Sequence, residues 1–195
     1  MIEFNYPEGA TPLDPDEVEG LLLTHITTRG ELDRWEQDNI LEAKAWLDKT
    51  RPSDILNEKF IKRLHKRMFG NVWKWAGQFR QSDKNIGGSS HQIPMSIRSL
   101  CDDTVLWLEL RDESPDLIAV RFHHRLVSIH PFPNGNGRHA REMANLFLKN
   151  MLKHPEFTWG SKNLSDAENI RNQYIESLQS ADNGDYKPLL AFVRT

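Results

Sequence analysis

Apolar residues recur every three to four positions along most of this chain, which is the spacing of amphipathic helices. Helix-start signals accompany the pattern: Asp14 and Ser114 each precede a proline, Ser53 precedes the helix expected at 56–68, and Ser165 lies three residues before a glutamate. An all-α protein is therefore expected. The predicted helices start after Asp14 and cover about residues 32–47, 56–68, 96–112, 115–129, 135–151 and 168–178, with a short last helix from Asp185.

Residues 79–95 have no helical period. Gly87, Gly88 and the two serines that follow are typical of turns, and Ile93 fits an edge strand. This composition agrees with a surface loop.

The segment from His130 to Arg141 reads HPFPNGNGRHAR and carries the clearest chemical signal. A helix that begins near Gly135 or Asn136 directs its first N–H groups and its positive dipole end at the preceding turn. Such a helix start favours an anion, either a phosphate or a carboxylate. Gly135 and Gly137 allow positive φ and close backbone approach, and the side-chain amide of Asn136 can bond one anion oxygen.

Two arginines and one histidine extend this anion site. Arg138 and Arg141 lie three positions apart on one helix face, and two guanidinium forks suit an elongated polyphosphate better than a single carboxylate. His130 precedes the turn, and a neutral imidazole is the usual proton acceptor near pH 7. A hydroxyl between His130 and a bound phosphate could attack phosphorus. A Gly/Asn/Pro turn before a helix also occurs as a plain connection between elements. The twelve residues from His130 to Arg141, taken together, favour a functional site.

The same segment resembles the signature of the Fic family, H-x-F-x-(D/E)-G-N-G-R-x-x-R. Every specified position but one matches, because Asn134 stands where the family has an acid. The similarity extends over about residues 35–193: residues 75–80 resemble the W-A-G-x-x-R stretch before the family's flap, and residues 174–185 its closing helix. Residues 11–14 and 25–32 are similar to a subgroup called mobile mystery protein B.

The resemblance implies an all-α, Fic-type helical bundle with one small β-hairpin flap. It implies a single globular catalytic domain over residues 35–195, preceded by an N-terminal arm and a candidate inhibitory helix in residues 1–34. The implied activity is transfer of AMP from ATP to a hydroxyl group on a target protein, with Mg²⁺. The expected partner is therefore a protein substrate with a Ser, Thr or Tyr hydroxyl.

The resemblance also implies a role for each matching residue. His130 is the general base, Gly135, Asn136 and Gly137 hold the α and β phosphates, and Phe132 anchors the loop in the core. Arg138 helps to hold the β phosphate and Arg141 holds the γ phosphate. The target docks by strand addition on a flap that comprises Asn85, Ile86, Gly87, Gly88, Ser89, Ser90 and His91.

Asn134 weakens the expectation of a metal ion. The family's acid binds Mg²⁺, whereas an asparagine offers a carbonyl oxygen without a charge. Two alternatives therefore stay open: a transferase of the same fold with another phosphate donor, and a catalytically weak nucleotide-binding or interaction module. The intact His130 argues against the second, since a pure binding module needs no base.

Glu31 admits two interpretations. Residues 27–31 match the first five positions of the family's inhibitory pattern (S/T)-x-x-x-E-(G/N), with Leu32 in place of the small final residue. In that interpretation Glu31 pairs with Arg141 and excludes the γ phosphate. Alternatively, Thr28 and Glu31 form the capping box of the helix that follows.

The composition narrows the classes of partner and location. Lys and Arg total 25 and Asp and Glu total 28, for a formal charge of −3, so no basic field indicates a nucleic-acid ligand. No apolar run approaches the roughly 18 residues of a membrane span. The single cysteine, Cys101, excludes an internal disulfide and lies on an apolar helical stripe. Without a basic-then-apolar leader in the first residues, a cytoplasmic location is expected.

Overall fold

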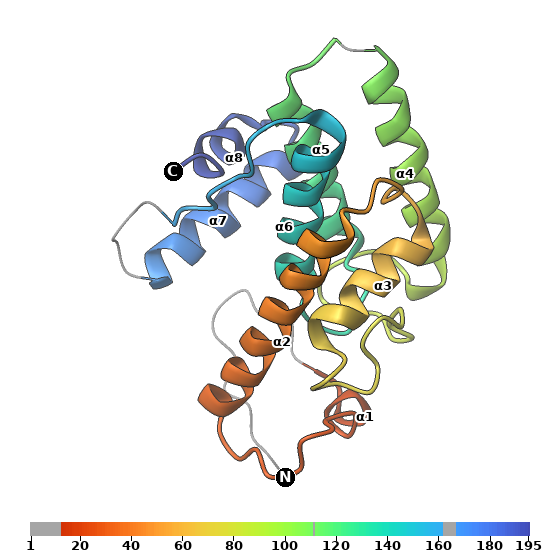
Figure 1. Cartoon of the computed structure of the whole chain (residues 1–195), viewed down its shortest axis with the longest axis vertical. Helices are drawn as coiled ribbons and strands as arrows, with labels where there is room; N and C mark the ends of the chain where they lie inside the picture. The colour runs from red at the N-terminus through yellow and green to blue at the C-terminus, as the bar shows by residue number, and fades with distance from the viewer. Residues whose placement is uncertain (1–12, 111, 162–166) are drawn as a thin grey trace.

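The computed structural model describes residues 13–110, 112–161 and 167–195, and within them the chain is mostly helical, as the hydrophobic periodicity predicted (Figure 1). No helix in these ranges is long and apolar enough to cross a lipid bilayer. The helices are α1 (Pro15–Val18), α2 (Arg29–Thr50), α3 (Glu58–Phe69), the 3₁₀ turn η1 (Ser90–Gln92), α4 (Ile93–Leu110), α5 (Pro115–Ile129), α6 (Asn136–Phe147), the π turn η2 (Leu148–Leu152), α7 (Ala167–Asp182) and α8 (Lys187–Phe192).

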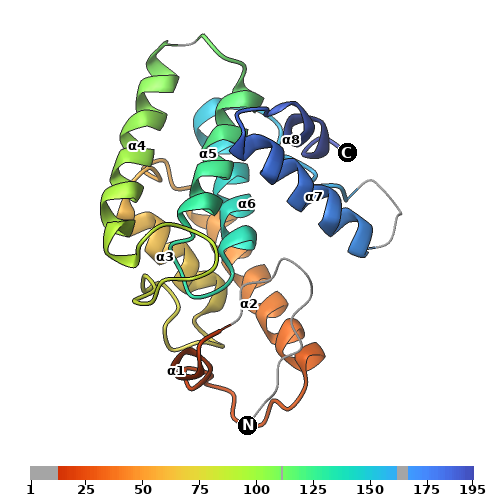
Figure 2. The same cartoon turned by 180° about the vertical axis from the view of Figure 1, so that it is seen from behind.

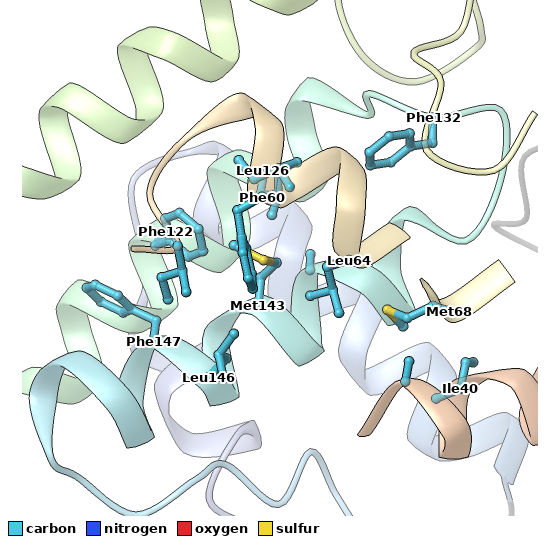
Figure 3. Close-up of a cluster of buried hydrophobic side chains, with 14 of the residues drawn as sticks. Ile40, Phe60, Leu64, Met68, Phe122, Leu126, Phe132, Met143, Leu146 and Phe147 are labelled. Carbon is cyan, nitrogen blue, oxygen red and sulfur yellow. The ribbon is translucent and has the colours of Figure 1, made fainter. Parts of the chain in front are cut away.

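Helix α6 lies at the centre of the bundle, alongside α5 and against α3 (Figures 1 and 2). Helix α2 pairs with α3, and α4 covers the outer side of α5. Helix α7 pairs with α8, and α8 packs on α5. Helix α7 also reaches α5 directly, through the hydrogen bond between Tyr174 Oη and His123 Nε2 at 3.0 Å. The side chains between α3, α5 and α6 are apolar and almost fully buried (Figure 3). This core includes Phe60, Leu64, Phe122, Leu126, Met143 and Phe147.

The connection between α5 and α6 brings two helix ends together. Helix α5 ends at Ile129, and His130 adopts left-handed backbone angles with φ of 51°. Helix α6 begins at Asn136, as expected, after Gly135 with φ of 77°. A Cβ atom on Gly135 would lie 2.7 Å from the ring of Phe69, so both conformation and space require glycine.

Several local predictions are corrected by the structure. Helix α3 is capped by Asn57, whose Oδ1 accepts from the N–H of Phe60, rather than by Ser53. Ile93 is not an edge-strand residue, because α4 begins there and buries its side chain. Trp35 is 44% exposed instead of facing the core. Residues 1–12 and the start of the capping box at 165–168 lie outside the described residues.

The segment 79–92, named the flap loop here, does not form the expected β-hairpin. The flap loop consists of turns followed by η1. Within the described ranges, β pairing is limited to an isolated bridge between Leu21 and Trp73, outside the flap loop. The buried guanidinium of Arg80 explains this, because it donates to the backbone carbonyls of Ser82 at 2.7 Å and Gly88 at 2.6 Å. These two bonds hold the flap loop in its turns.

The described part of the N-terminal arm is joined to the bundle. Helix α2 runs continuously across residue 34, and α1 packs on the flap loop through Lys84. The ammonium of Lys84 lies 2.7 Å from Asp14 Oδ2 and 2.5 Å from Glu17 Oε2. The division between residues 34 and 35 stays a prediction.

Candidate functional site

A cavity of about 970 Å³ opens where α5 ends and α6 begins. Its walls come from the flap loop, the start of α2, the 134–138 turn and one face of α7. Its volume is at the upper end of the range of small-molecule sites, about 300–1,000 Å³. His130, Asn134, Gly135, Asn136, Gly137, Arg138 and Arg141 all line this cavity, so the structure brings the expected base, turn and cations together.

His130 is a buried base without a partner. Its side chain is 7% exposed, and neither ring nitrogen has a hydrogen-bond partner in the structure. Burial, together with the positive charges of Arg80 and Lys84, lowers the pKa of His130 to about 4. The imidazole is therefore neutral at pH 7 and has a lone pair ready to accept a proton. Buried unpaired polar atoms are uncommon and often mark functional sites.

The flap loop contacts His130 directly. Gly87 has φ of 92°, and a Cβ atom there would lie 2.9 Å from His130 Cβ and 2.9 Å from the carbonyl oxygen of Ile129. Ile86 and Gly87 also line the cavity. The flap loop therefore packs closely against His130 at the cavity wall.

Arg80 joins the flap loop to the connection between α5 and α6. Its side chain is 1% exposed, its Nε donates to the carbonyl of His130 at 2.7 Å, and its backbone N–H donates to the carbonyl of Pro131 at 3.0 Å. With the bonds to Ser82 and Gly88, one guanidinium holds three carbonyls. The sequence showed Arg80 only as part of a resembling stretch; its role depends on contacts far apart in the chain.

The turn before α6 is fixed by the side chain of Asn136. Asn136 Oδ1 accepts from the N–H of Phe132 at 2.9 Å, and its Nδ2 donates to the carbonyl of Phe132 at 2.7 Å. The side-chain amide is therefore engaged by the turn in this structure, and its bond to an anion oxygen stays a prediction. The backbone N–H of Asn136 belongs to the start of α6, where N–H groups lack intrahelical partners. Gly137 does not adopt the positive φ that glycine allows. A Cβ atom at Gly137 would lie 3.7 Å from Tyr174 Oη, which is an ordinary van der Waals contact.

His65 supports the turn from beneath. Its Nδ1 accepts from the N–H of Gly77 at 3.0 Å, so its Nε2–H donates to the carbonyl of Asn134 at 3.0 Å. Its ring stacks on Phe132 with centroids 3.7 Å apart, and both side chains are fully buried. Nothing in the sequence around His65 indicated this role, although its position four residues after the buried Ile61 places it on the core face of α3.

The two arginines have different surroundings. Arg138 pairs with Glu36 at 2.5 Å and lies over the ring of Phe69. Arg141 donates from Nε to the carbonyl of Gly137 at 3.3 Å and lies 5.4 Å from the ring centroid of Tyr174. Burial lowers the pKa of Arg141, which nevertheless stays charged at neutral pH. Both cations therefore face one cavity at different depths.

Glu31 forms the capping box of α2. Its Oε2 accepts from the N–H groups of Thr27 at 3.0 Å and Thr28 at 3.1 Å, and its own N–H donates to Thr28 Oγ1 at 3.3 Å. The backbone hydrogen bonds lower the pKa of Glu31. The capping interpretation is confirmed, whereas the contact between Glu31 and Arg141 is not formed in this structure.

The residues of the turn do not suit a magnesium ion held by the protein. Asn134 Oδ1 accepts from the N–H of Gly135 at 2.6 Å and lies 3.4 Å from Arg138 Nη2. It is a neutral oxygen beside a cation, whereas Mg²⁺ prefers carboxylates. No cluster of three or more His, Cys, Asp or Glu with metal-site geometry occurs in the part of the chain that is described.

Comparisons with known proteins agree with this geometry. The model of the Fic/DOC family matches residues 55–148. A protein of Aedes aegypti named protein adenylyltransferase Fic is 30% identical over 145 residues, which cover 72% of this chain and 28% of that protein. The chain therefore spans less than a third of the length of this relative.

Solved structures share the fold. Fic-1 of C. elegans superposes with a TM-score of 0.65 at 24% identity, over 80% of this chain and 46% of that one. BepC, a VirB-translocated effector of Bartonella tribocorum with bound AMPPNP, superposes with a TM-score of 0.65 at 18% identity, over 87% of each chain. The resemblance to the mobile mystery protein B subgroup stays a prediction.

Proposed function

Because this chain carries a Fic/DOC domain, we propose that it is a protein adenylyltransferase, which transfers AMP from ATP to a hydroxyl side chain of a target protein. The observation that carries the proposal is the unpaired imidazole of His130 at the edge of a cavity that also contains the start of α6 and two arginines. This arrangement supports a proton acceptor next to a polyphosphate.

In the proposed reaction, the target hydroxyl loses its proton to His130 as its oxygen attacks the α phosphorus of ATP. A bond forms between that oxygen and the α phosphorus, and the bond to the oxygen that bridges the α and β phosphates breaks. Pyrophosphate leaves. The backbone N–H groups at the start of α6 stabilise charge on the phosphate oxygens, and Arg138 and Arg141 hold the β and γ phosphates.

The target is proposed to dock along residues 85–91 of the flap loop, next to Ile86 and Gly87 at the cavity wall. Backbone pairing with an extended target segment fits this position. Such pairing requires the flap loop to exchange its present turn for a strand, since Arg80 now bonds the carbonyl of Gly88.

Self-inhibition through Glu31 stays part of the proposal. Glu31→Gly removes both the cap and the proposed brake, while Glu31→Gln preserves a capping box. A rise in AMP transfer in Glu31→Gly supports the brake. A fall in the stability of Glu31→Gly without a rise in AMP transfer does not support it. Unchanged transfer with a lower melting temperature shows that Glu31 only caps α2.

The proposed activity is tested with ATP labelled at the α phosphate or at the γ phosphate, in a lysate and with the protein alone. Covalent label from α-labelled ATP only is the expected result. Label from γ-labelled ATP indicates phosphorylation by a transferase of the same fold. No label despite ATP binding indicates another donor or the weak nucleotide-binding module that Asn134 suggests.

A further inference from the structure

Glu36 is a buried carboxylate in the middle of α2 that contacts the phosphate-facing turn. Its side chain is 4% exposed. The Nε1–H of Trp73 donates to its Oε1 at 2.6 Å, and Nη1 of Arg138 donates to its Oε2 at 2.5 Å. One charge-assisted donor from a distant loop and one from α6 therefore converge on a single carboxylate.

Arg138 is held on one edge and open on another. Its side chain is 30% exposed and lines the cavity. Nη1 faces Glu36, Nη2 lies 3.4 Å from Asn134 Oδ1, and the guanidinium carbon lies 4.9 Å from the ring centroid of Phe69. Because a guanidinium has five N–H donors in a fixed plane, a carboxylate on one edge leaves donors for a phosphate on another.

The surroundings of Glu36 do not allow it to move aside. Helix α2 is fixed in the core on both sides of Glu36 by Leu32 and Ile40, which are at most 6% exposed. Trp73 is 1% exposed and stacks on Trp75 with centroids 4.9 Å apart. Removing Arg138 from this carboxylate would leave an uncompensated buried charge, which is strongly unfavourable. A nucleotide therefore does not displace Glu36 in the way that it would displace an inhibitory side chain.

We propose that Glu36 is a positioning residue, which holds the guanidinium of Arg138 at the orientation that meets the β phosphate of the nucleotide. The inference rests on the proposed function, which places the β phosphate at Arg138. Glu36 does not line the cavity, so it reaches a bound nucleotide only through Arg138. Its effect on binding is therefore confined to the part of the nucleotide that Arg138 reaches.

The test compares the dissociation constants of ADP and AMP, because only ADP carries a β phosphate. The variants are Glu36→Gln, which keeps the shape of the side chain, Glu36→Ala, Arg138→Ala and the double variant Glu36→Gln/Arg138→Ala. Glu42→Gln is the matched control, since Glu42 lies on α2 and accepts a hydrogen bond from Asn71 Nδ2 at 2.9 Å but is absent from the cavity wall. Melting temperatures accompany each titration.

We expect ADP to bind at least tenfold more weakly to Glu36→Gln and to Arg138→Ala than to the wild-type protein. The dissociation constant of AMP should change less than twofold. The double variant should bind ADP no more weakly than Arg138→Ala, because Glu36 acts through that arginine. Tighter ADP binding and faster AMP transfer in Glu36→Gln would overturn the inference and make Glu36 a brake. Equal losses for ADP and AMP would reduce Glu36 to a structural role.

A failure of the proposed function gives a different pattern. In that case the wild-type protein binds neither ADP nor AMP, or it binds both and Arg138→Ala does not remove a preference for ADP. Either result overturns the inference together with the function. Wild-type binding with an ADP preference that survives Glu36→Gln and Glu36→Ala overturns the inference alone.

Discussion

The side chain of Arg80 donates from Nε to the carbonyl oxygen of His130 at 2.7 Å, and the same guanidinium holds the flap loop through Ser82 and Gly88. His130 is a non-glycine residue with φ of 51°, a conformation that needs support from its surroundings. The base and the loop that covers it are thus held by one buried cation.

Arg80→Lys is expected to lower AMP transfer by about a hundredfold and stability by roughly 2–4 kcal/mol, because a lysine cannot bond three separate carbonyls in a plane. Label transfer and urea denaturation measure the two effects. Arg125→Lys is the control, since Arg125 pairs with Asp103 at the surface and such pairs contribute about 0–1 kcal/mol. Equal effects of the two substitutions would contradict the role given to Arg80.

Gly87→Ala is expected to abolish most AMP transfer while nucleotide binding is retained. The new Cβ atom would meet His130 Cβ and the carbonyl of Ile129 at 2.9 Å, at a φ of 92°. Gly88→Ala is the matched control, because the nearest atom to its Cβ is Gln92 Oε1 at 3.9 Å. If both substitutions leave transfer unchanged, the flap loop does not govern access to His130.

The helices could be predicted from the sequence because periodicity and caps are local properties. The site from His130 to Arg141 could be predicted for the same reason, since its base, turn and cations are contiguous. Arg80, Glu36 and His65 could not be assigned roles, because their partners lie 50, 102 and 69 residues away and only packing brings them together.

Two expectations failed or stayed open for physical reasons. The Gly-rich segment fitted both a loop and a hairpin. In the structure it is a loop, which the side chain of Arg80 holds through hydrogen bonds to the carbonyls of Ser82 and Gly88. Glu31 fitted both a cap and a brake, because the local sequence of a capping box overlaps with the inhibitory pattern. Its bond to Thr28 settles the first interpretation and leaves the second to experiment.

Stability is expected to fall as the pH is lowered from 6.5. Burial lowers the pKa of His123 and His139 to about 3 and that of His130 to about 4, whereas the unfolded histidines titrate near 6.5. Between these values the unfolded chain binds more protons, so each such histidine reduces the free energy of unfolding by about 1.4 kcal/mol per pH unit.

Urea denaturation between pH 7.5 and 5 measures this slope before most carboxylates are protonated. His130→Asn should reduce the slope by the contribution of one histidine. The same free energy of unfolding at pH 7.5 and pH 5 would contradict the burial of neutral imidazoles.

Asn134→Asp is expected to raise AMP transfer several-fold and to lower the Mg²⁺ concentration for half-maximal transfer. The substitution places a carboxylate, which Mg²⁺ prefers, at a position where a neutral oxygen now lies 3.4 Å from Arg138 Nη2. Titration of Mg²⁺ at fixed ATP measures the effect. A decrease in transfer would indicate that the new carboxylate pairs with Arg138 at the expense of the phosphate.

The central claim is that His130 accepts the proton of the attacking hydroxyl. The most direct measurement is the mass of modified peptides after incubation with ATP, for the wild-type protein and for His130→Ala, with ATP binding measured for both. We predict a peptide heavier by one AMP in the wild type and a loss of at least a hundredfold in His130→Ala, with ATP binding retained. Equal modification by the two proteins would contradict the account.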